Sequence, residues 1–107
     1  MKPWEIWSYE PPGWGQPHPA VIISAPGRVS NKPEINVVMC STRQAMRPAL
    51  PNEVILDTAD GLNWPTLCKC DLIHLVDKSK VSNQRGVVTA ERRRQIIETM
   101  NRSNGWI

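Results

Sequence analysis

The sequence contains no phenylalanine, no internal repeat and no long apolar run. A membrane-spanning helix needs roughly 20 consecutive apolar residues, and no stretch approaches that length, so we expect no membrane segment. The opening residues, MKPWEIWSYE, hold no apolar core of the kind that signal peptides carry. A chain of 107 residues is expected to form a single domain, here over residues 1–107. Its five tryptophans supply large aromatic side chains.

Neither net charge nor cysteine content is high. The formal net charge of +3 permits an anionic partner, such as nucleic acid or an acidic peptide, without requiring one. Three arginines in a row, 92–94, diverge around a helix and favour a solvated helix face over a compact nucleic-acid patch. Three cysteines, an odd number in a chain without a visible secretion signal, are expected to stay reduced in the cytoplasm.

Prolines and short apolar stretches fill the first two-thirds of the chain, which favours short strands and loops there. Five β-like stretches lie between Gly, Pro or Asn clusters, at residues 5–10, 20–24, 34–42, 52–57 and 66–78. The final segment has no proline, and Thr89 is expected to cap a helix over about 90–103. The pattern predicts a mainly β (α+β) fold, a small antiparallel β-barrel with strands within 4–78 and a C-terminal α-helix.

The longest apolar stretch, TLCKCDLIHLVDK, has two charged residues in its middle. Strand alternation places Lys69 and Asp71 on one face and Cys68 and Cys70 on the other, and a bulge near residues 72–73 would exchange the faces of the second half. The charged residues are either a structural ion pair or part of a site. Because Cys-x-Cys lacks the spacing of a zinc knuckle, we expect the cysteines to pack in the core, with no metal and no cofactor.

Six stretches resemble, in order and spacing, the MazF/PemK toxins, which are RNA-cleaving toxins of bacterial toxin–antitoxin modules. The first three are WEIWSYE, GWGQPHPAVIIS and INVVMCST, similar to the opening strand, a Gly/Gln-rich loop with its following strand, and a strand ending in Ser or Thr. LPNEVILD, DGLNWPTLCKCD and DLIHLVDK continue the similarity to residue 78. The resemblance implies an SH3-like barrel, usually a homodimer, that binds an acidic antitoxin protein and, together with it, DNA.

The resemblance implies a metal-independent endoribonuclease that cuts single-stranded mRNA. In the family the substrate's own 2′-hydroxyl attacks the phosphorus and leaves a cyclic phosphate, which requires a base, an acid and donors for the developing charge. Lys69 and Asp71 match an arginine and a base aspartate, and His18 stands where the family has an arginine. Thr42 matches a strand-ending threonine. The predicted catalytic residues are therefore Asp71, Lys69, His18 and Thr42.

The resemblance also suggests residues that bind RNA. Arg28 and Lys32 lie in APGRVSNKP, read here as a loop matching the family loop that covers the RNA groove, and both are expected to contact phosphate. Trp14 is predicted to stack on a base. Ser41 and Arg43, beside the matched threonine, complete the set.

Ordinary structural roles remain open for His18, Thr42 and Trp14, and two other functions remain open for the chain. The departures from arginine at positions 18 and 69 allow a catalytically degenerate member that binds an acidic antitoxin peptide or RNA without cutting. The fold is shared with a gyrase-poisoning toxin that depends on C-terminal hydrophobic residues, so Trp106–Ile107 keep gyrase inhibition as a third reading.

Overall fold

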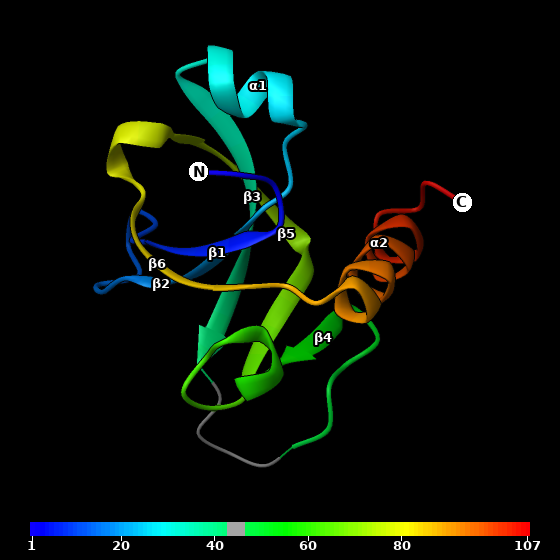
Figure 1. Cartoon of the computed structure of the whole chain (residues 1–107). Coiled ribbons are helices and arrows are strands. Elements are labelled where there is room, and N and C mark those ends of the chain that lie inside the picture. Colours follow the sequence, from blue (N-terminus) through cyan, green and yellow to red (C-terminus); the bar gives the residue numbers. More distant parts are fainter. Residues whose placement is uncertain (43–46) are drawn as a thin grey trace.

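The structure, a computed structural model, describes residues 1–42 and 47–107, without the side chain of Thr42. Six strands form one antiparallel sheet in the order β4-β5-β3-β2-β1-β6 (Figure 1). The strands are β1 (Glu5–Tyr9), β2 (His18–Ile22), β3 (Glu34–Thr42), β4 (Glu53–Leu56), β5 (Thr66–Asp77) and β6 (Ser82–Val87). The helices are α1 (Pro26–Asn31) and α2 (Ala90–Ser103), with the short 3-10 helices η1 (Thr58–Asp60) and η2 (Lys78–Lys80).

The predicted mainly β fold with a C-terminal helix is confirmed, as a curled half-barrel with β4 and β6 at the two edges of the sheet. Two details were wrong. Strand β6 lies beyond residues 4–78, and its sequence SNQRGV gives no apolar alternation because most of its residues are exposed. Helix α1 replaces the expected loop, since Pro26 suits a first helical turn, where no backbone donor is needed, and Val29 is buried beneath it.

Strand β5 contains the irregularity that decides its two faces. Cys68 pairs with Cys40, whereas Ile73 pairs with Val38, so two steps along β3 correspond to five along β5. The shift between these pairs exchanges the faces of the strand, as the anticipated bulge requires. Ile73 therefore lies on the same side of the sheet as Cys68, although simple alternation assigns them to opposite sides.

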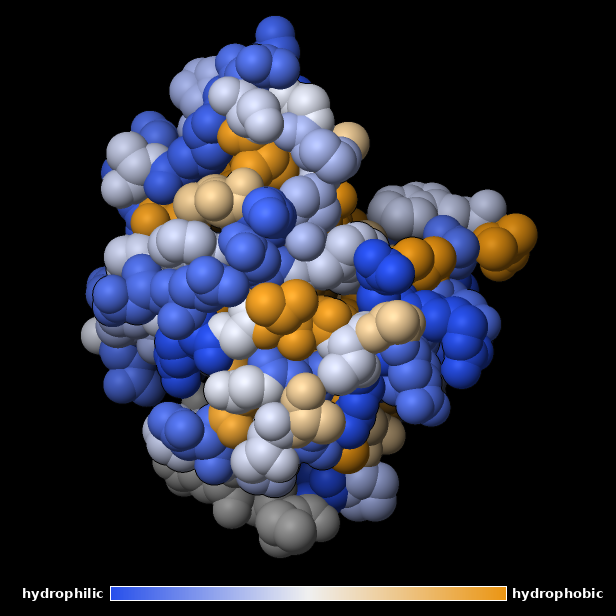
Figure 2. All heavy atoms as spheres, viewed as in Figure 1, coloured by the Kyte–Doolittle hydropathy of each residue, from blue (hydrophilic) through white to orange (hydrophobic). Residues whose placement is uncertain are grey.

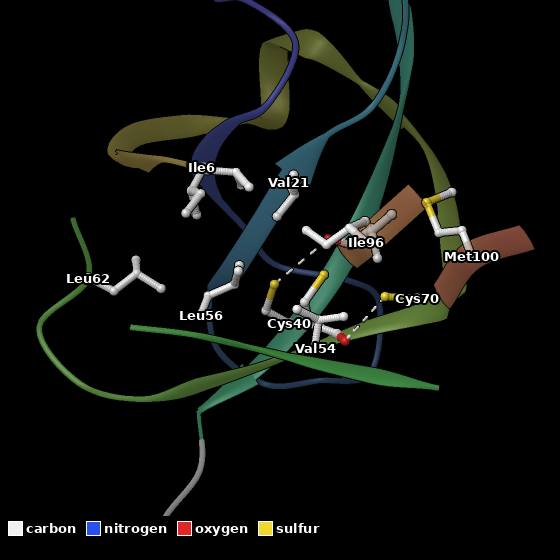
Figure 3. Close-up of a cluster of buried hydrophobic side chains, with 12 residues drawn as sticks. Ile6, Val21, Cys40, Val54, Leu56, Leu62, Cys70, Ile96 and Met100 are labelled. Atoms are coloured by element: carbon white, nitrogen blue, oxygen red, sulfur yellow. Dashed lines mark hydrogen bonds between the residues drawn. The ribbon is translucent and has the colours of Figure 1, made fainter. Parts of the chain in front are cut away.

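Helix α2 covers one side of the sheet, which we call the helix face. Ile96 is fully buried there, and Figure 3 shows it directed at the side chains of Val21, Cys40 and Val54. The predicted cap is confirmed, because the Thr89 hydroxyl accepts a hydrogen bond from the Arg92 amide at 3.2 Å. None of the helices in the described ranges is long and apolar enough to span a membrane.

A Schellman motif ends α2. Gly105 has a φ of +70°, and the amide of Trp106 donates to the Asn101 carbonyl at 2.8 Å. The opposite side of the sheet, which we call the open face, has its own apolar cluster beneath α1, comprising Ala20, Ile22, Val29, Ile35, Val37, Met39, Val76 and Val81. The two clusters place the core on both sides of a curled sheet.

Candidate active site

The charged residue Lys69 lies on the open face. Cys68 is buried in the cluster under α2, so the neighbouring Leu67 and Lys69 point to the other side of β5. Ser41 pairs with Leu67 and shares that side. Continuing the β2–β3 register beyond its last printed pair places His18 across from Ser41, on the same face. The curled sheet thus brings three of the predicted site residues to one surface.

Lys69 belongs to an ion cluster centred on a buried carboxylate. Glu53 pairs with Lys69 across β4 and β5, and its side chain is fully buried. The Lys69 ammonium donates to Glu53 Oε2 at 2.8 Å, and Arg47 donates to both carboxylate oxygens at 2.7 and 2.9 Å. The amide of Leu50 donates to Oε1 at 2.9 Å. We call Arg47, Glu53 and Lys69 the Glu53 cluster.

The partners of Glu53 keep it ionised. The guanidinium of Arg47 has the largest effect, and with Lys69 and the Leu50 amide it outweighs the opposing effect of burial. Together they lower the pKa of Glu53 to about 2. A carboxylate in this state attracts its two cations at any pH at which the protein would act.

Asp71 lies apart from this cluster. It is exposed and accepts a hydrogen bond from the side-chain amide of Asn52 at 2.9 Å. The interpretation of Lys69 and Asp71 as a structural ion pair is wrong, because Lys69 pairs with Glu53 and no bridge to Asp71 occurs among the described residues. The Asn52 carbonyl also accepts from the Cys70 amide at 2.9 Å, so the start of β4 holds the irregular part of β5. Asp71 thus presents an accessible carboxylate, which a proton acceptor requires.

His18 lies at the start of β2 in an aromatic cluster. The His18 and Trp14 rings are 4.9 Å apart and nearly perpendicular, and Trp14 makes a similar contact with His74 at 6.3 Å. The Nδ1 atom of His18 is buried and has no hydrogen-bond partner in the described part of the chain. Trp14 therefore contacts the imidazole rings of both His18 and His74. Of these two histidines, only His18 was predicted from the sequence as a site residue.

The predicted phosphate contacts Arg28 and Lys32 lie elsewhere. The Arg28 Nε donates to the Glu34 carbonyl at 3.0 Å, at the beginning of β3. Ser41 is seven residues further along this strand, a separation of about 20 Å. Figure 1 accordingly shows α1 at the end of β3 away from β4. The structure does not bring Arg28 and Lys32 together with Lys69.

Two predicted residues fall at the limit of what the structure describes. Arg43 lies outside the described residues. Thr42 is described by its backbone, which pairs with Thr66, while its side chain lies outside the description. Both stay predictions from the family resemblance.

Sequence reasoning missed Arg47, Asn52, Glu53 and His74. A carboxylate at the beginning of the apolar stretch EVIL was the available signal for Glu53. Nothing in the sequence indicates its partners, because Lys69 is 16 residues away and meets it only through strand pairing. His74 was assigned to a strand face, yet its contact with Trp14 depends on how the loop before β2 folds.

The three cysteines pack in the core as predicted, each with no exposed surface. Contact with Cys40 and burial raise the pKa of Cys68, and contact with Cys68 and burial raise the pKa of Cys70. Both shifts favour the neutral thiol in the buried core. In residues 1–42 and 47–107, no group of three or more His, Cys, Asp or Glu side chains is arranged to hold a metal ion.

A family model described as PemK-like, MazF-like toxin of type II toxin–antitoxin system matches residues 2–103. The chain belongs to this family, which confirms the resemblance seen in its six sequence stretches. A comparison with curated proteins gave no match.

Solved structures of low sequence identity share the fold. The Mycobacterium tuberculosis toxin MazF-mt6 is 19% identical with a TM-score of 0.80, over 94% of this chain and 96% of that one. A mycobacterial endoribonuclease in complex with its cognate antitoxin is 20% identical with a TM-score of 0.81, over 98% and 95%. A MazE–MazF structure from Deinococcus radiodurans is 16% identical with a TM-score of 0.76, over 98% and 95%.

Proposed function

We propose that this protein is the ribonuclease toxin of a toxin–antitoxin module and cuts single-stranded mRNA without a metal ion. The supporting observation is that the sheet of a MazF/PemK-family chain gathers His18, Ser41 and Lys69 on one open face. A half-buried imidazole and a cation on one surface are suited to proton transfer and to charge stabilisation at a phosphate.

The proposed reaction is an internal transfer of the phosphodiester bond. Asp71 takes the proton of the substrate 2′-hydroxyl, whose oxygen attacks the adjacent phosphorus. The bond from phosphorus to the 5′-oxygen breaks, and His18 gives that oxygen a proton, which leaves a 2′,3′-cyclic phosphate and a free 5′-hydroxyl. Lys69 stabilises the negative charge on the phosphorane. Thr42 is retained as a catalytic residue on the strength of the resemblance.

Cleavage in the presence of a chelator tests this proposal. The purified protein should cut single-stranded RNA in EDTA and leave ends that carry a cyclic phosphate. An Asp71→Ala, His18→Ala double variant should lose this cleavage, whereas Glu98→Ala, on the exposed surface of α2, should retain it. Unchanged cleavage by the double variant would show that the assignment of the base and the acid is wrong.

For RNA binding, we propose that Trp14 stacks on a base while Ser41 and Arg43 contact the strand near the reacting phosphate. Arg28 and Lys32 would meet the same RNA only if it ran about 20 Å along β3. Shortening the RNA should therefore remove any effect of Arg28→Gln before it removes the effect of Trp14→Ala. Equal effects at every length would contradict this arrangement.

One observation favours the alternative of a binding protein that does not cut. The Lys69 ammonium is engaged by the buried carboxylate of Glu53, which reduces the charge that it offers to a phosphorane. A degenerate toxin would bind RNA or an acidic antitoxin peptide, and its expression would not arrest growth. Growth arrest together with fragmented mRNA would exclude this alternative, and DNA damage without RNA loss would point to gyrase.

We also propose a cytoplasmic homodimer that is neutralised by an acidic antitoxin, in keeping with the family resemblance. A groove beside the C-terminal end of α2 is lined mostly by apolar side chains, namely Trp4, Ile23, Ile97, Met100 and Trp106, together with Asn101. Figure 2 shows apolar groups at this end of the helix, among several apolar patches on this side of the molecule. Sedimentation analysis of Ile97→Glu tests the dimer: if this groove is its interface, the variant should be monomeric.

A further inference from the structure

In the Glu53 cluster, one buried carboxylate binds two cations that lie at the surface. The carboxylate is fully buried, whereas the side chains of Arg47 and Lys69 are 33% and 27% exposed. Two cations and one anion leave an excess of positive charge at the mouth of the cluster. A buried carboxylate needs compensating charge, but its backbone hydrogen bond from Leu50 and one cation would already provide much of it.

We propose that Arg47 and Lys69 form a binding site for a backbone phosphate of the RNA, and that Glu53 is the positioning residue for both. This inference rests on the proposed function and extends it. Arg47 and Glu53 have no counterpart among the catalytic positions that the family resemblance supplies, and Lys69 gains a partner in phosphate binding.

The donors of Arg47 are arranged for a second acceptor. Its Nη1 donates to Glu53 and to the Pro48 carbonyl, and its Nη2 donates to Glu53. A guanidinium has five N–H groups, so one N–H on Nη2 and the one on Nε have no acceptor among the described residues. These two form the planar fork that binds phosphate through two parallel hydrogen bonds. Lys69 likewise uses one of its three N–H groups on Glu53.

The guanidinium of Arg47 supplies a planar fork that the chain lacks at its family-matched positions. His18 and Lys69 stand where the resemblance places arginines, and neither can present a planar fork to a phosphate. Arg47 supplies such a fork from the segment before β4, next to Lys69 on the open face. The carboxylate of Glu53 fixes the direction of the fork by holding the adjacent Nη1–Nη2 edge of the guanidinium.

The salt dependence of binding separates a phosphate site from mere neutralisation of Glu53. The probe is a short fluorescein-labelled oligonucleotide with 2′-O-methyl groups, which cannot react, and the measurement is fluorescence anisotropy over a series of salt concentrations. Each lost contact between a cation and a phosphate of a single strand reduces the slope of log affinity against log salt by about 0.7. Arg47→Gln and Lys69→Gln should each reduce the slope by that amount.

A matched control removes the same charge elsewhere. Arg94 pairs with Glu98 on the exposed side of α2, so Arg94→Gln should leave the slope unchanged. If the glutamine variants fold poorly, Arg47→Lys provides a second test, because it keeps the positive charge and loses the planar fork. It should keep the slope of the native protein and lower kcat on cleavable RNA. Circular dichroism and thermal melting verify the fold of each variant.

Glu53→Gln tests the positioning role. It leaves both cations in place and makes the cluster more positive, so binding of the probe should not weaken. The cleavage rate should nevertheless fall about 10-fold to 100-fold, because the cations lose their fixed orientation. The control Glu98→Gln should change neither property. A purely structural role for Glu53 would instead weaken binding and cleavage together with the fold.

The outcomes are distinguishable. If the native protein neither binds nor cuts RNA, the proposed function fails and this inference fails with it. If the native protein binds RNA but Arg47→Gln and Lys69→Gln leave the slope unchanged, the phosphate site alone is refuted. If the slopes fall while Glu53→Gln cuts as well as Glu98→Gln, the positioning role of Glu53 is refuted and the phosphate contacts stand.

Discussion

The two faces of the curled sheet differ in what their buried groups are bonded to. On the helix face, Ile96 of α2 packs in a cluster of apolar side chains that includes three buried cysteines. The open face has its own apolar cluster beneath α1 and, in addition, buries the ionised carboxylate of Glu53, which is held by cations at the surface. The comparison teaches that apolar clusters can be assembled from strands by hydrophobicity alone, whereas the Glu53 cluster depends on particular partners at particular distances.

The largest expected effect is on the helix face. Ile96→Ala should lower the free energy of unfolding by about 3 kcal/mol, because it removes a fully buried side chain from beneath α2 and leaves a cavity. The control Glu98→Ala, at a side chain that is 60% exposed, should cost less than about 1 kcal/mol. Urea unfolding measures both. Similar losses at the two positions would contradict the assignment of the helix face.

The contribution of the open face to the free energy of unfolding depends on pH. The folded-state pKa of Glu53 is about 2, below its ordinary value of 4.5, so the unfolded chain binds the proton more readily. The stabilisation is complete above about pH 4.5 and is lost as the pH falls toward 2, with a magnitude of about 3 kcal/mol. Unfolding measured across this window should show the loss in the native protein.

Glu53→Gln serves as the reference for that pH effect. The variant lacks the titrating group, so its stability should fall less over the same window, and the difference between the two proteins isolates Glu53. Parallel pH profiles for the native protein and the variant would show that the carboxylate is not stabilised by Arg47 and Lys69.

A smaller effect is expected at the cysteines. Cys68→Ser should cost about 1–2 kcal/mol, because it places a hydroxyl in a core with no exposed surface, and Cys68→Ala should cost less. The cleavage rate per folded molecule should be unchanged in both variants. Loss of cleavage at full folding would connect the helix face to catalysis and remove the distinction between the two faces.

Much of the fold could be read from the chain, since proline and glycine clusters separate the strands and alternation sets which side of each is buried. The inward placement of Cys68 and the cap at Thr89 follow from such local rules. Strand β6 and helix α1 could not be read this way, because the polar sequence of β6 and the proline at the start of α1 are also typical of loops.

The sequence identified residues of the candidate site but did not indicate which partners they contact. Lys69 and Asp71 were identified as the unusual charges in an apolar strand, yet they bond to different partners, Glu53 and Asn52. Both partners lie at the start of β4, which meets β5 only through strand pairing, and neither residue type nor spacing specifies that pairing.

The sequence by itself determined the positions of five strands and the C-terminal helix, the burial of the cysteines and the family of the chain. Only the tertiary structure decided that a buried Glu53 holds Arg47 and Lys69, and that Trp14 contacts both His18 and His74. The physical reason is that burial and alternation are local properties of a strand, whereas partners depend on which strands and loops the curled sheet brings together.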